Sequence, residues 1–305
     1  NYIESVWWSL KQIADKGLLC KGYKIVPYCP RCGTALSSHE VAQGYKDVEE
    51  KSIFVKFAVK GRKDTYFLAW TTTPWTLPSN VALCVNPKED YSEIRVGEET
   101  YILADALISS LFKEGEYEKL SVKKGKDYEY TEYEPLFDYD TGAKEKAWYV
   151  TCDGYVTLTD GTGVVHIAPA FGEDDSNVGK RYGLPFVQMV DTRGRFVEAA
   201  YDLNDVFAKD ADKLIIEKLA KEGKLFKELM FTHSYPFCWR CDTPLLYYAR
   251  SSWFIKVTAV KDALLKSNAS VNWMPPSIGT GRMGNFLENV IDWGISRERY
   301  WGTPL

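Results

Sequence analysis

Four of the seven cysteines fall into two closely spaced pairs, the pattern in this chain that most directly suggests chemistry. The pairs are Cys29 with Cys32 and Cys238 with Cys241. A C-x-x-C turn presents two thiolates to one metal ion, and two such turns complete the tetrahedral four-sulfur shell that zinc favours. We therefore expect one shared zinc ion rather than two unrelated redox-active or buried pairs. Because that shell leaves no open coordination position, the zinc would be structural.

A second unusual stretch, residues 70–80, has the sequence WTTTPWTLPSN and follows an apolar segment typical of a strand. It gathers the hydroxyls of Thr71, Thr72, Thr73 and Thr76. Hydroxyls require hydrogen-bond partners, and the two prolines of the stretch cannot continue the hydrogen-bond ladder of a strand. The stretch is therefore either a decorated loop or part of a site.

The third stretch, residues 161–175, has the sequence GTGVVHIAPAFGEDD. An apolar strand carries His166, and a turn leads into a helix whose first turn holds Glu173, Asp174 and Asp175. Taken alone, His166 fits a hydrogen-bonded core histidine, and the acids fit charge compensation at a helix N-terminus. The alternative is that one carboxylate turns toward the strand end and offers a fixed negative charge to a cation. An ammonium group is the obvious candidate.

Hydrophobic periodicity predicts the elements that must position these stretches. A helix is expected over residues 2–16, ended by Gly17, with two further helices over about residues 174–182 and 210–222. Short segments rich in β-branched and aromatic residues predict strands over residues 52–59, 65–72, 81–85, 92–96, 100–103, 148–151, 163–168 and 186–190. This many short strands in the middle of the chain favours a β-barrel or a sandwich.

Length and composition set limits on the function. The 305 residues are 45% hydrophobic and 26% charged, which is typical of a soluble globular protein with one large or two smaller domains. A formal net charge of −4 argues against a broad basic face, so any contact with nucleic acid should be local. No apolar run approaches the ~20 residues that span a bilayer, and the first residues lack a secretory signal. We expect a cytoplasmic protein without membrane contact.

These three stretches, together with the terminal DWGISRERYWGTPL, resemble the editing insertion of class I isoleucyl-tRNA synthetases over essentially the whole chain. The resemblance implies an α+β fold, namely a closed β-barrel editing domain with peripheral helices plus a zinc-ribbon-like connective segment. The expected parts are a connective helix with the first zinc knuckle at 1–48, the β-barrel at 49–224, and the second knuckle with a return segment toward the synthetase core at 225–305. The sequence lacks the HIGH-like and KMSKS-like signatures of that core, so we expect no aminoacylation by this chain.

The activity that the resemblance implies is hydrolysis of valine from mischarged Val-tRNA(Ile), with valyl-adenylate as an open second substrate. A second sieve is needed because one methylene in an apolar pocket separates isoleucine from valine by only about 1–3 kcal/mol, a figure for which this enzyme family is itself the standard case. In this scheme Asp175 pairs with the α-ammonium of the substrate, and His166 excludes the extra methylene of isoleucine. The partners would be the 3′ end of tRNA(Ile) carrying valine and the remainder of the synthetase chain.

The resemblance also implies roles for the threonine-rich stretch, with no catalytic cofactor and no covalent intermediate. Its hydroxyls and backbone amides would contact the terminal adenosine, the ester carbonyl or the attacking water. The residues concerned are Thr71, Thr72 and Thr73, with Thr76 close behind. Trp75 would wall the side-chain pocket or stack on the terminal base, since stacking on aromatic rings is tolerant of sequence. Asn80 is a weaker candidate for a positioning residue.

Two other functions remain open on the sequence alone. One is a zinc-knuckle tRNA-binding module of a class I synthetase that performs no chemistry. The other is a metal-dependent hydrolase, which is weaker because all four paired thiolates would serve one closed site. In addition, His39, His166 and His233 form no H-x-x-x-H pattern. We expect His39 and His233 to be surface residues rather than substitute zinc ligands.

Overall fold

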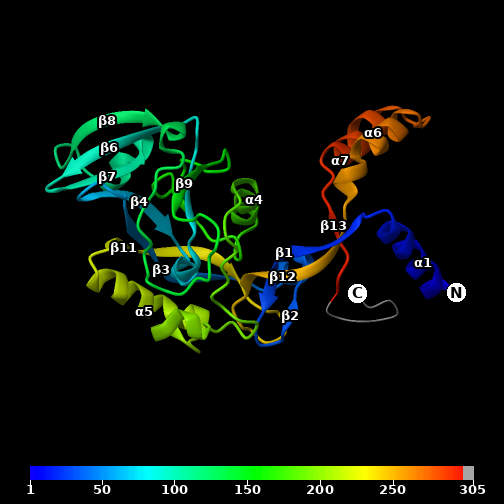
Figure 1. The fold of residues 1–305 in the computed structure, drawn as a ribbon, viewed down its shortest axis with the longest axis horizontal. Coiled ribbons are helices and arrows are strands. Elements are labelled where there is room, and N and C mark those ends of the chain that lie inside the picture. Colours follow the sequence, from blue (N-terminus) through cyan, green and yellow to red (C-terminus); the bar gives the residue numbers. More distant parts are fainter. Residues whose placement is uncertain (298–305) are drawn as a thin grey trace. The chain divides into compact units, whose positions relative to one another are not determined.

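The computed structural model describes residues 1–297 and divides into two compact units (Figure 1). Unit 2 comprises Ile25–Tyr248, and unit 1 comprises Asn1–Lys24 together with the chain from Ala249 onward. Most of the SRERYWG segment at 296–302, which we expect to return to the synthetase core, lies outside the described residues. Within residues 1–297, no helix has both the length and the apolar character needed to cross a membrane. The three parts expected from the sequence, residues 1–48, 49–224 and 225–305, are defined by function rather than by compactness, and they stay a prediction.

A six-stranded sheet is the largest element of unit 2 and has the order β11-β3-β4-β7-β6-β8 (Figure 1). Its strands are β3 Tyr45–Ala58, β4 Thr65–Thr71, β6 Asp90–Val96, β7 Glu99–Ala104, β8 Glu118–Lys124 and β11 Leu225–Pro236. Neighbouring strands are antiparallel except β4 and β7, which run parallel. Every residue of β3 from Ser52 to Val55 is buried, so both faces of the sheet are covered there and the core of unit 2 lies around this segment.

A three-stranded sheet, in the order β10-β5-β9, completes the β-structure around the candidate site. Its strands are β5 Ala82–Val85, β9 Tyr149–Cys152 and β10 Val164–Ile167. The central strand β5 is buried throughout, antiparallel to β10 and parallel to β9. The fold is therefore mixed α+β, as expected. The sheets formed by the described residues do not include a closed barrel, so barrel closure stays a prediction.

Two longer helices flank the sheets of unit 2: α4 Glu173–Tyr182 and α5 Ala208–Lys221. Helix α4 ends at Gly183, whose φ of 64° suits the left-handed conformation of a helix C-terminus. Helix α5 buries an apolar stripe that includes Ile215 and Leu219, and it contacts both β11 and the 3-10 helix η1. The shorter helices are α2 Ser38–Ala42, η1 Pro74–Ser79, η2 Asp105–Leu107, α3 Ile108–Leu111, η3 Gly125–Tyr128 and η4 Glu198–Leu203.

Unit 1 is mainly helical among its described residues. Its helices are α1 Tyr2–Asp15, η5 Val257–Val260, α6 Lys261–Ala269, the π-helix η6 Gly279–Met283 and α7 Gly284–Glu288. The short strand β13 Trp293–Gly294 pairs with the end of β12. Two strands, β1 Leu19–Cys29 and β12 Leu246–Ile255, carry the chain from one unit into the other. Within unit 2, β1 pairs with β2 Thr34–Ala35 next to the first cysteine pair.

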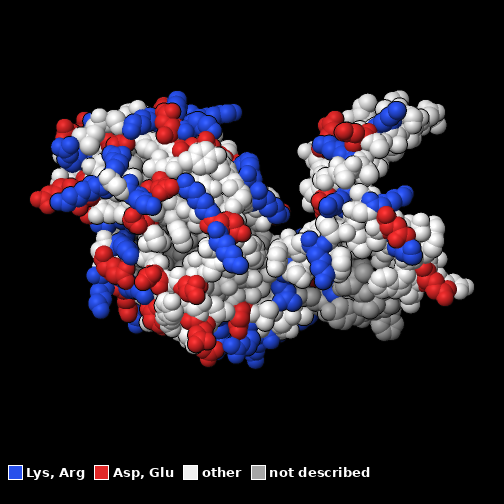
Figure 2. Space-filling model, viewed as in Figure 1, with Lys and Arg blue, Asp and Glu red and all other residues white. Residues whose placement is uncertain are grey.

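Charged side chains of both signs are mixed over the visible face of unit 2 (Figure 2). On the edge strand β8, the lysines lie beside acids of neighbouring segments: Lys119 Nζ is 2.5 Å from Asp105, and Lys123 Nζ is 3.0 Å from Glu93. Paired lysines of this kind form a solvated surface rather than a stripe that binds phosphates. The visible face therefore agrees with the expectation that any contact with nucleic acid is local.

The predicted helices are confirmed as α1, α4 and α5, and every predicted strand is present except the one over residues 186–190. In that segment Val190 forms only an isolated bridge with Phe196. The Met189 amide donates to the Ser79 hydroxyl at 3.3 Å instead of to a neighbouring strand. The prediction was wrong there because a side chain takes the backbone donor that a ladder would need.

Candidate functional site

The threonine-rich stretch lies between β4 and β5 and changes structure where its first proline occurs. Thr71 is the last residue of β4, Pro74 is the first residue of η1, and Asn80 follows η1. Proline has a fixed φ and no amide hydrogen, so it suits the first position of a helix and cannot extend a strand. The predicted end of the strand is therefore confirmed, and the stretch is a turn of 3-10 helix rather than an open loop.

Three threonine hydroxyls of this stretch form one hydrogen-bonded chain. Thr71 Oγ1 lies 3.3 Å from Thr73 Oγ1, which lies 3.4 Å from Thr76 Oγ1. The Thr76 hydroxyl also donates to the Thr73 carbonyl oxygen at 2.8 Å. Thr71 and Thr76 are buried, whereas Thr72 and Thr73 are half-buried. Thr72 takes no part in the hydroxyl chain and keeps its partial exposure.

His166 extends the hydroxyl chain from strand β10. The residue is 8% exposed, and its Nε2 lies 3.0 Å from Thr76 Oγ1. Because the Thr76 proton already goes to the Thr73 carbonyl, we assign the ring hydrogen to Nε2, which leaves Nδ1 as an unprotonated acceptor. Nδ1 is buried without a partner among residues 1–297. Burial lowers the pKa of His166 to about 4, so the imidazole is neutral at pH 7.

Asp175, in the first turn of α4, turns back to the end of β10. Its Oδ2 accepts a hydrogen bond from the Ala168 amide at 2.9 Å. A Cβ on Gly172 would lie 2.8 Å from the Asp175 carboxyl carbon, so this close approach favours glycine. Asp175 keeps some exposed area, yet the protein atoms around its carboxyl raise its pKa to about 7 through loss of solvation. Its neighbours Glu173 and Asp174 are exposed.

Strand β10 joins the two halves of this site, because His166 lies on the strand and Ala168 follows its end. The hydroxyl chain meets the side chain of His166, and Asp175 meets the backbone amide of Ala168. Through β10 and the residue after it, the structure connects residues from β4, η1 and α4. The most distant of them in the sequence are Thr71 and Asp175. The resulting arrangement has a neutral histidine, aligned hydroxyls and a carboxyl group that a nearby cation would ionise.

Asn80 is held by its own surroundings. Its Nδ2 donates to the Ala82 carbonyl at 2.8 Å, and its Oδ1 accepts from the Tyr133 hydroxyl at 2.6 Å. Both ends of the amide are used within the protein, so the contacts suit a residue that fixes the start of β5 rather than one that touches a ligand. Sequence reasoning did not single out Tyr133, whose signal in the sequence is that of an ordinary apolar core residue.

Trp75 is buried, with 3% of its surface exposed. Its ring meets Phe171 edge to face, with ring centroids 5.0 Å apart. Its Nε1 is buried without a partner among the described residues. Of the two roles considered for Trp75, this burial favours the wall of a pocket over stacking on an incoming base.

A cavity of about 260 Å³ lies beside β10 and is lined in part by Trp70 and Val165, the residues before Thr71 and His166. Trp70 and Tyr155 supply aromatic rings to its lining, and Thr157, Thr159 and Asp160 supply polar groups. The Tyr155 hydroxyl is buried without a partner in the described part of the chain. Burial, and after it the negative charge of Asp175, raises the pKa of Tyr155. No local pattern in the sequence marks Tyr155 as a cavity residue.

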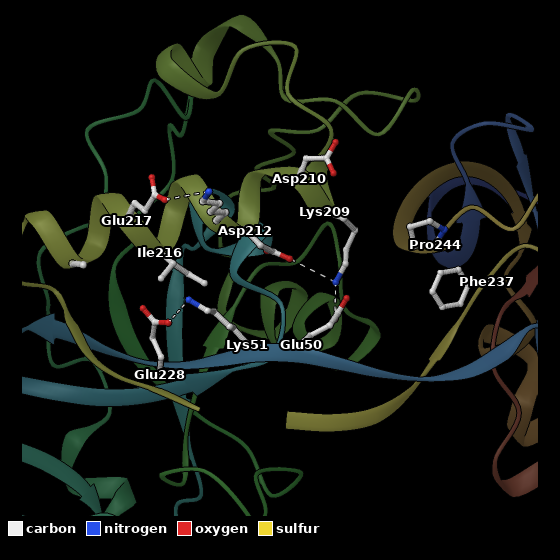
Figure 3. Close-up of a pocket in the computed structure, with 12 residues that line it drawn as sticks. Glu50, Lys51, Lys209, Asp210, Asp212, Ile216, Glu217, Glu228, Phe237 and Pro244 are labelled. Carbon is white, nitrogen blue, oxygen red and sulfur yellow. Dashed lines mark hydrogen bonds and ion pairs between the residues drawn. The ribbon is translucent and has the colours of Figure 1, made fainter. Parts of the chain in front are cut away.

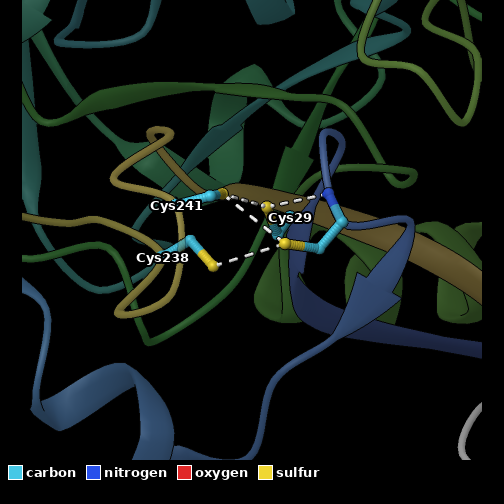
Figure 4. Close-up of side chains that lie close together, drawn as sticks. Cys29, Cys238 and Cys241 are labelled. Carbon is cyan, nitrogen blue, oxygen red and sulfur yellow. Dashed lines mark hydrogen bonds between the residues drawn. The ribbon is translucent and has the colours of Figure 1, made fainter.

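The four paired cysteines form a compact sulfur cluster within unit 2 (Figure 4). All four sulfurs lie within 4.8 Å of one another. Cys241 Sγ is 3.5 Å from the sulfurs of both Cys29 and Cys32, and Cys32 Sγ is 3.9 Å from that of Cys238. A zinc tetrahedron with Zn–S bonds of about 2.3 Å has sulfur–sulfur edges of about 3.8 Å. The cluster can therefore hold a metal ion, and its cysteines are free thiols.

The two cysteine turns are built alike. In each turn, the residue after the second cysteine donates its amide to the carbonyl of the first, from Gly33 at 2.9 Å and from Asp242 at 2.8 Å. Both residues adopt the left-handed conformation, with φ of 67° at Gly33 and 59° at Asp242. His39 is exposed, and the His233 ring lies 3.4 Å from Glu50. Neither histidine joins the group of possible metal ligands found among residues 1–297.

Asp212 is a further residue near this site that sequence reasoning missed. Its Oδ1 accepts a hydrogen bond from the Trp75 amide at 2.8 Å, across 137 positions of sequence. Asp212 is one of several charged residues in the sequence of α5, AKDADKLIIEKLAK, so no local pattern marks it as a partner of the threonine-rich stretch. Only the packing of α5 against η1 reveals the contact.

Comparison with known proteins identifies related sequences along the whole chain. The model of the family "tRNA synthetases class I (I, L, M and V)" matches residues 1–305. The isoleucine-tRNA ligase of Clostridium acetobutylicum is 59% identical over 305 residues, which are 100% of this chain and 29% of that protein. The corresponding protein of Picrophilus torridus is 52% identical over 305 residues, with the same coverage of 100% and 29%. The chain thus spans about 29% of the length of these relatives.

Solved structures give a weaker match. The chain is similar to the crystal structure of GlLeuRS-CP1, with a TM-score of 0.45 and 14% identity, over 58% of this chain and 98% of that one. The cytosolic leucyl-tRNA synthetase editing domain of P. knowlesi matches with a TM-score of 0.44 and 11% identity, over 60% of this chain and 98% of that one.

Proposed function

Since the chain belongs to the class I tRNA synthetases of the I, L, M and V group, we propose that it is an editing segment that hydrolyses mischarged Val-tRNA(Ile). Its sequence identity to isoleucine-tRNA ligases supports the choice of tRNA. The observation that carries the proposal is that one segment, β10 with the residue after it, contacts the threonine hydroxyl chain through the neutral His166 and the Asp175 carboxyl through the Ala168 amide. Hydrolysis of valyl-adenylate at the same site stays an open question that needs its own assay.

Recognition of the amino acid falls to Asp175 and His166. The α-ammonium of valine would pair with Asp175 and restore the ionised carboxylate that burial disfavours. His166 is neutral and so does not repel this ammonium. Its buried ring would also limit the size of the side chain that fits, which admits valine and excludes the extra methylene of isoleucine. Trp75 would form a wall of the same pocket.

The chemical step is addition of water to the ester carbonyl carbon, followed by cleavage of the bond between that carbon and the ribose oxygen. The ribose oxygen leaves with a proton that the water supplies, and valine leaves as the free acid. Thr71, Thr72 and Thr73 would orient the water and donate hydrogen bonds to the oxyanion as its charge develops. The vicinal ribose hydroxyl would help to hold the water.

The sulfur cluster would hold a structural zinc ion away from this chemistry. Four thiolates fill a tetrahedral shell, so the ion would join the chain at Cys29 and Cys32 to the chain at Cys238 and Cys241 without an open position for water. The partners would be the valine-carrying 3′ end of tRNA(Ile) and the rest of a cytoplasmic synthetase. Editing would then depend on that larger protein to deliver the tRNA.

Replacing Asp175 tests the proposal, with the exposed neighbour Asp174 as the matched control. We expect Asp175→Ala to lower kcat/KM for deacylation of Val-tRNA(Ile) by about 30-fold or more, since losing a buried partner of a charge costs about 2–5 kcal/mol. Asp174→Ala should retain the activity because its side chain is exposed. Release of labelled valine by the complete protein that carries this chain gives the rate. Equal rates for wild type and Asp175→Ala would remove Asp175 from the site.

A tRNA-binding module without chemistry is the second candidate, because the cysteine turns alone would serve such a role. The same assay separates the two. If neither the wild type nor Asp175→Ala releases valine above the spontaneous rate while both bind tRNA(Ile), the chain binds without catalysis. A measurable wild-type rate decides for the hydrolase.

A further inference from the structure

A cavity of about 770 Å³ lies between helix α5 and strands β3 and β11, and charged side chains line much of it (Figure 3). Lys209 is the most enclosed of its cations, with 11% of its side chain exposed. Its Nζ lies 2.8 Å from Glu50 and 3.6 Å from Asp212. The same ammonium lies 4.7 Å from the ring centroid of Tyr235. Lys209 therefore holds two carboxylates close together at the edge of the cavity.

The second oxygen of Asp212 points to a different partner. Oδ1 accepts the hydrogen bond from the amide of Trp75, the second residue of η1. The first amides of a helix have no partner inside the helix. The side chain of Thr73, the residue that precedes η1, does not cap the backbone amides of this first turn. Asp212 on α5 therefore supplies the acceptor that the local sequence does not.

This contact is one residue away from the candidate hydrolytic site. Trp75 is followed by Thr76, whose hydroxyl meets His166 at 3.0 Å. The carboxyl of Asp212 keeps 20% of its side chain exposed, and the surrounding protein raises its pKa to about 7 through burial, which the charge of Lys209 opposes. Lys209 thus partly offsets the burial that favours the protonated form of Asp212, whose Oδ1 is the acceptor behind the threonine-rich stretch.

We propose that Asp212 is a positioning residue of the hydrolytic site, because it holds the Trp75 amide and so fixes the Thr76 hydroxyl against His166. Lys209 keeps the Asp212 carboxylate oriented toward that amide. The role in hydrolysis rests on the proposed deacylase function, whereas the hydrogen bond to Trp75 can be measured without any substrate. The two ideas can therefore fail separately.

Hydrogen exchange at the Trp75 amide is the first test. Selective 15N labelling of the ten tryptophans limits the NMR spectrum to a few backbone amide signals. The signal that is lost in Trp75→Phe is that of the Trp75 amide. Asp212→Ala should speed exchange at Trp75 by about 10- to 100-fold, the factor expected for loss of a hydrogen bond to a charged group. Asp212→Asn should stay close to wild type, because the amide oxygen of asparagine can accept the same bond. Asp210 lines the same cavity, so Asp210→Ala is the matched control and should leave hydrogen exchange at the Trp75 amide unchanged.

Deacylation of Val-tRNA(Ile) by the complete protein is the second test. Asp212→Ala should lower kcat by about 10-fold with little change in KM, since misplacing catalytic groups slows the chemical step. Asp212→Asn should restore most of the rate, which a general loss of stability would not predict. If Asp212→Ala does not fold, Lys209→Met replaces it and should speed Trp75 exchange by a smaller factor.

The outcomes separate the possible errors. Unchanged exchange at Trp75 in Asp212→Ala would overturn the proposal, and so would faster exchange accompanied by wild-type kcat. A wild type that releases no valine would overturn the proposed deacylase function itself. Faster exchange, reduced kcat and rescue by asparagine would together support Asp212 as the positioning residue.

Discussion

The sulfur cluster and the threonine-histidine-aspartate site both unite distant parts of the chain, but different kinds of contact hold them. The cysteine pairs lie more than two hundred positions apart, and each turn is closed by its own local hydrogen bond. The hydroxyl chain also has local hydrogen bonds, such as the one from the Thr76 hydroxyl to the Thr73 carbonyl oxygen at 2.8 Å, but no metal ligands among residues 1–297 join it to the other segments. It depends on His166 from β10 and, one residue away, on the contact between Trp75 and Asp212.

This difference explains how each region is specified. A metal ion can organise four thiolates once two turns present them, so the ligands and their spacing define the site. Hydroxyl groups have weak individual preferences, and their direction is set by whichever buried acceptors and donors surround them. The candidate hydrolytic site is therefore defined as much by residues outside the motifs, Tyr133 and Asp212, as by the motifs themselves.

The largest effect should follow removal of the metal. Cys238→Ser takes one thiolate from the proposed zinc shell, and we expect it to lose zinc and several kcal/mol of unfolding free energy, because binding a structural zinc contributes about 10–16 kcal/mol in small zinc peptides. Metal analysis and thermal unfolding of the purified protein measure both quantities. Cys20→Ser is the matched control, since Cys20 is a half-buried single thiol outside the cluster.

The same experiment tests whether the two regions are chemically independent. A protein that is stripped of zinc by a chelator but remains folded should still deacylate Val-tRNA(Ile). Loss of hydrolysis under those conditions would mean that the metal takes part in the chemistry. A wild type with no bound zinc, or a Cys238→Ser variant as stable as wild type, would remove the structural role.

An intermediate effect is expected from His166. His166→Ala should enlarge the pocket and allow hydrolysis of Ile-tRNA(Ile), so that discrimination against isoleucine falls by about 10- to 200-fold, the range that one methylene supplies. The ratio of kcat/KM for the two charged tRNAs measures it. His233→Ala serves as the control, because His233 lies on β11 beside Glu50. Unchanged discrimination would exclude His166 from the specificity role.

The same contrast explains how far the sequence predicted the structure. The cysteine spacing predicted the sulfur cluster, and the threonine and histidine stretches predicted which segments form the candidate site. Periodicity found the buried strands, such as β5 and β10. It missed β11, most of whose residues between Leu225 and Ser234 are exposed or half-buried, because a strand without a buried face shows no alternation of apolar and polar residues.

The partners of the site residues could not be predicted for a related reason. Asp212 and Tyr133 reach the threonine-rich stretch only through packing of α5 and of the segment before β9. Their residue types are ordinary at those positions. A long-range hydrogen bond to a backbone amide or a side-chain amide produces no recognisable spacing pattern in the sequence. Two cysteines separated by two residues do produce such a pattern.

The smallest expected effect is the dependence of deacylation on pH, which follows from the titration of the Asp175 carboxyl in the candidate hydrolytic site. Its pKa rises from the ordinary 3.8 to about 7 in the folded chain, so below pH 7 the protonated carboxyl cannot pair with an ammonium. We expect kcat/KM for Val-tRNA(Ile) to fall by about 10-fold per unit below pH 7, and the Asp175→Asn variant to lack this slope.

Stability without substrate should respond in the opposite direction. The folded chain binds the Asp175 proton more tightly than the unfolded chain does, so this group stabilises the fold fully below about pH 4 and loses that contribution as the pH rises through about 7. Thermal unfolding of wild type and Asp175→Asn across this range measures the difference. Identical slopes in both proteins would mean that Asp175 titrates normally. The sulfur cluster should respond with the reverse sign, because protons compete with the metal for thiolates.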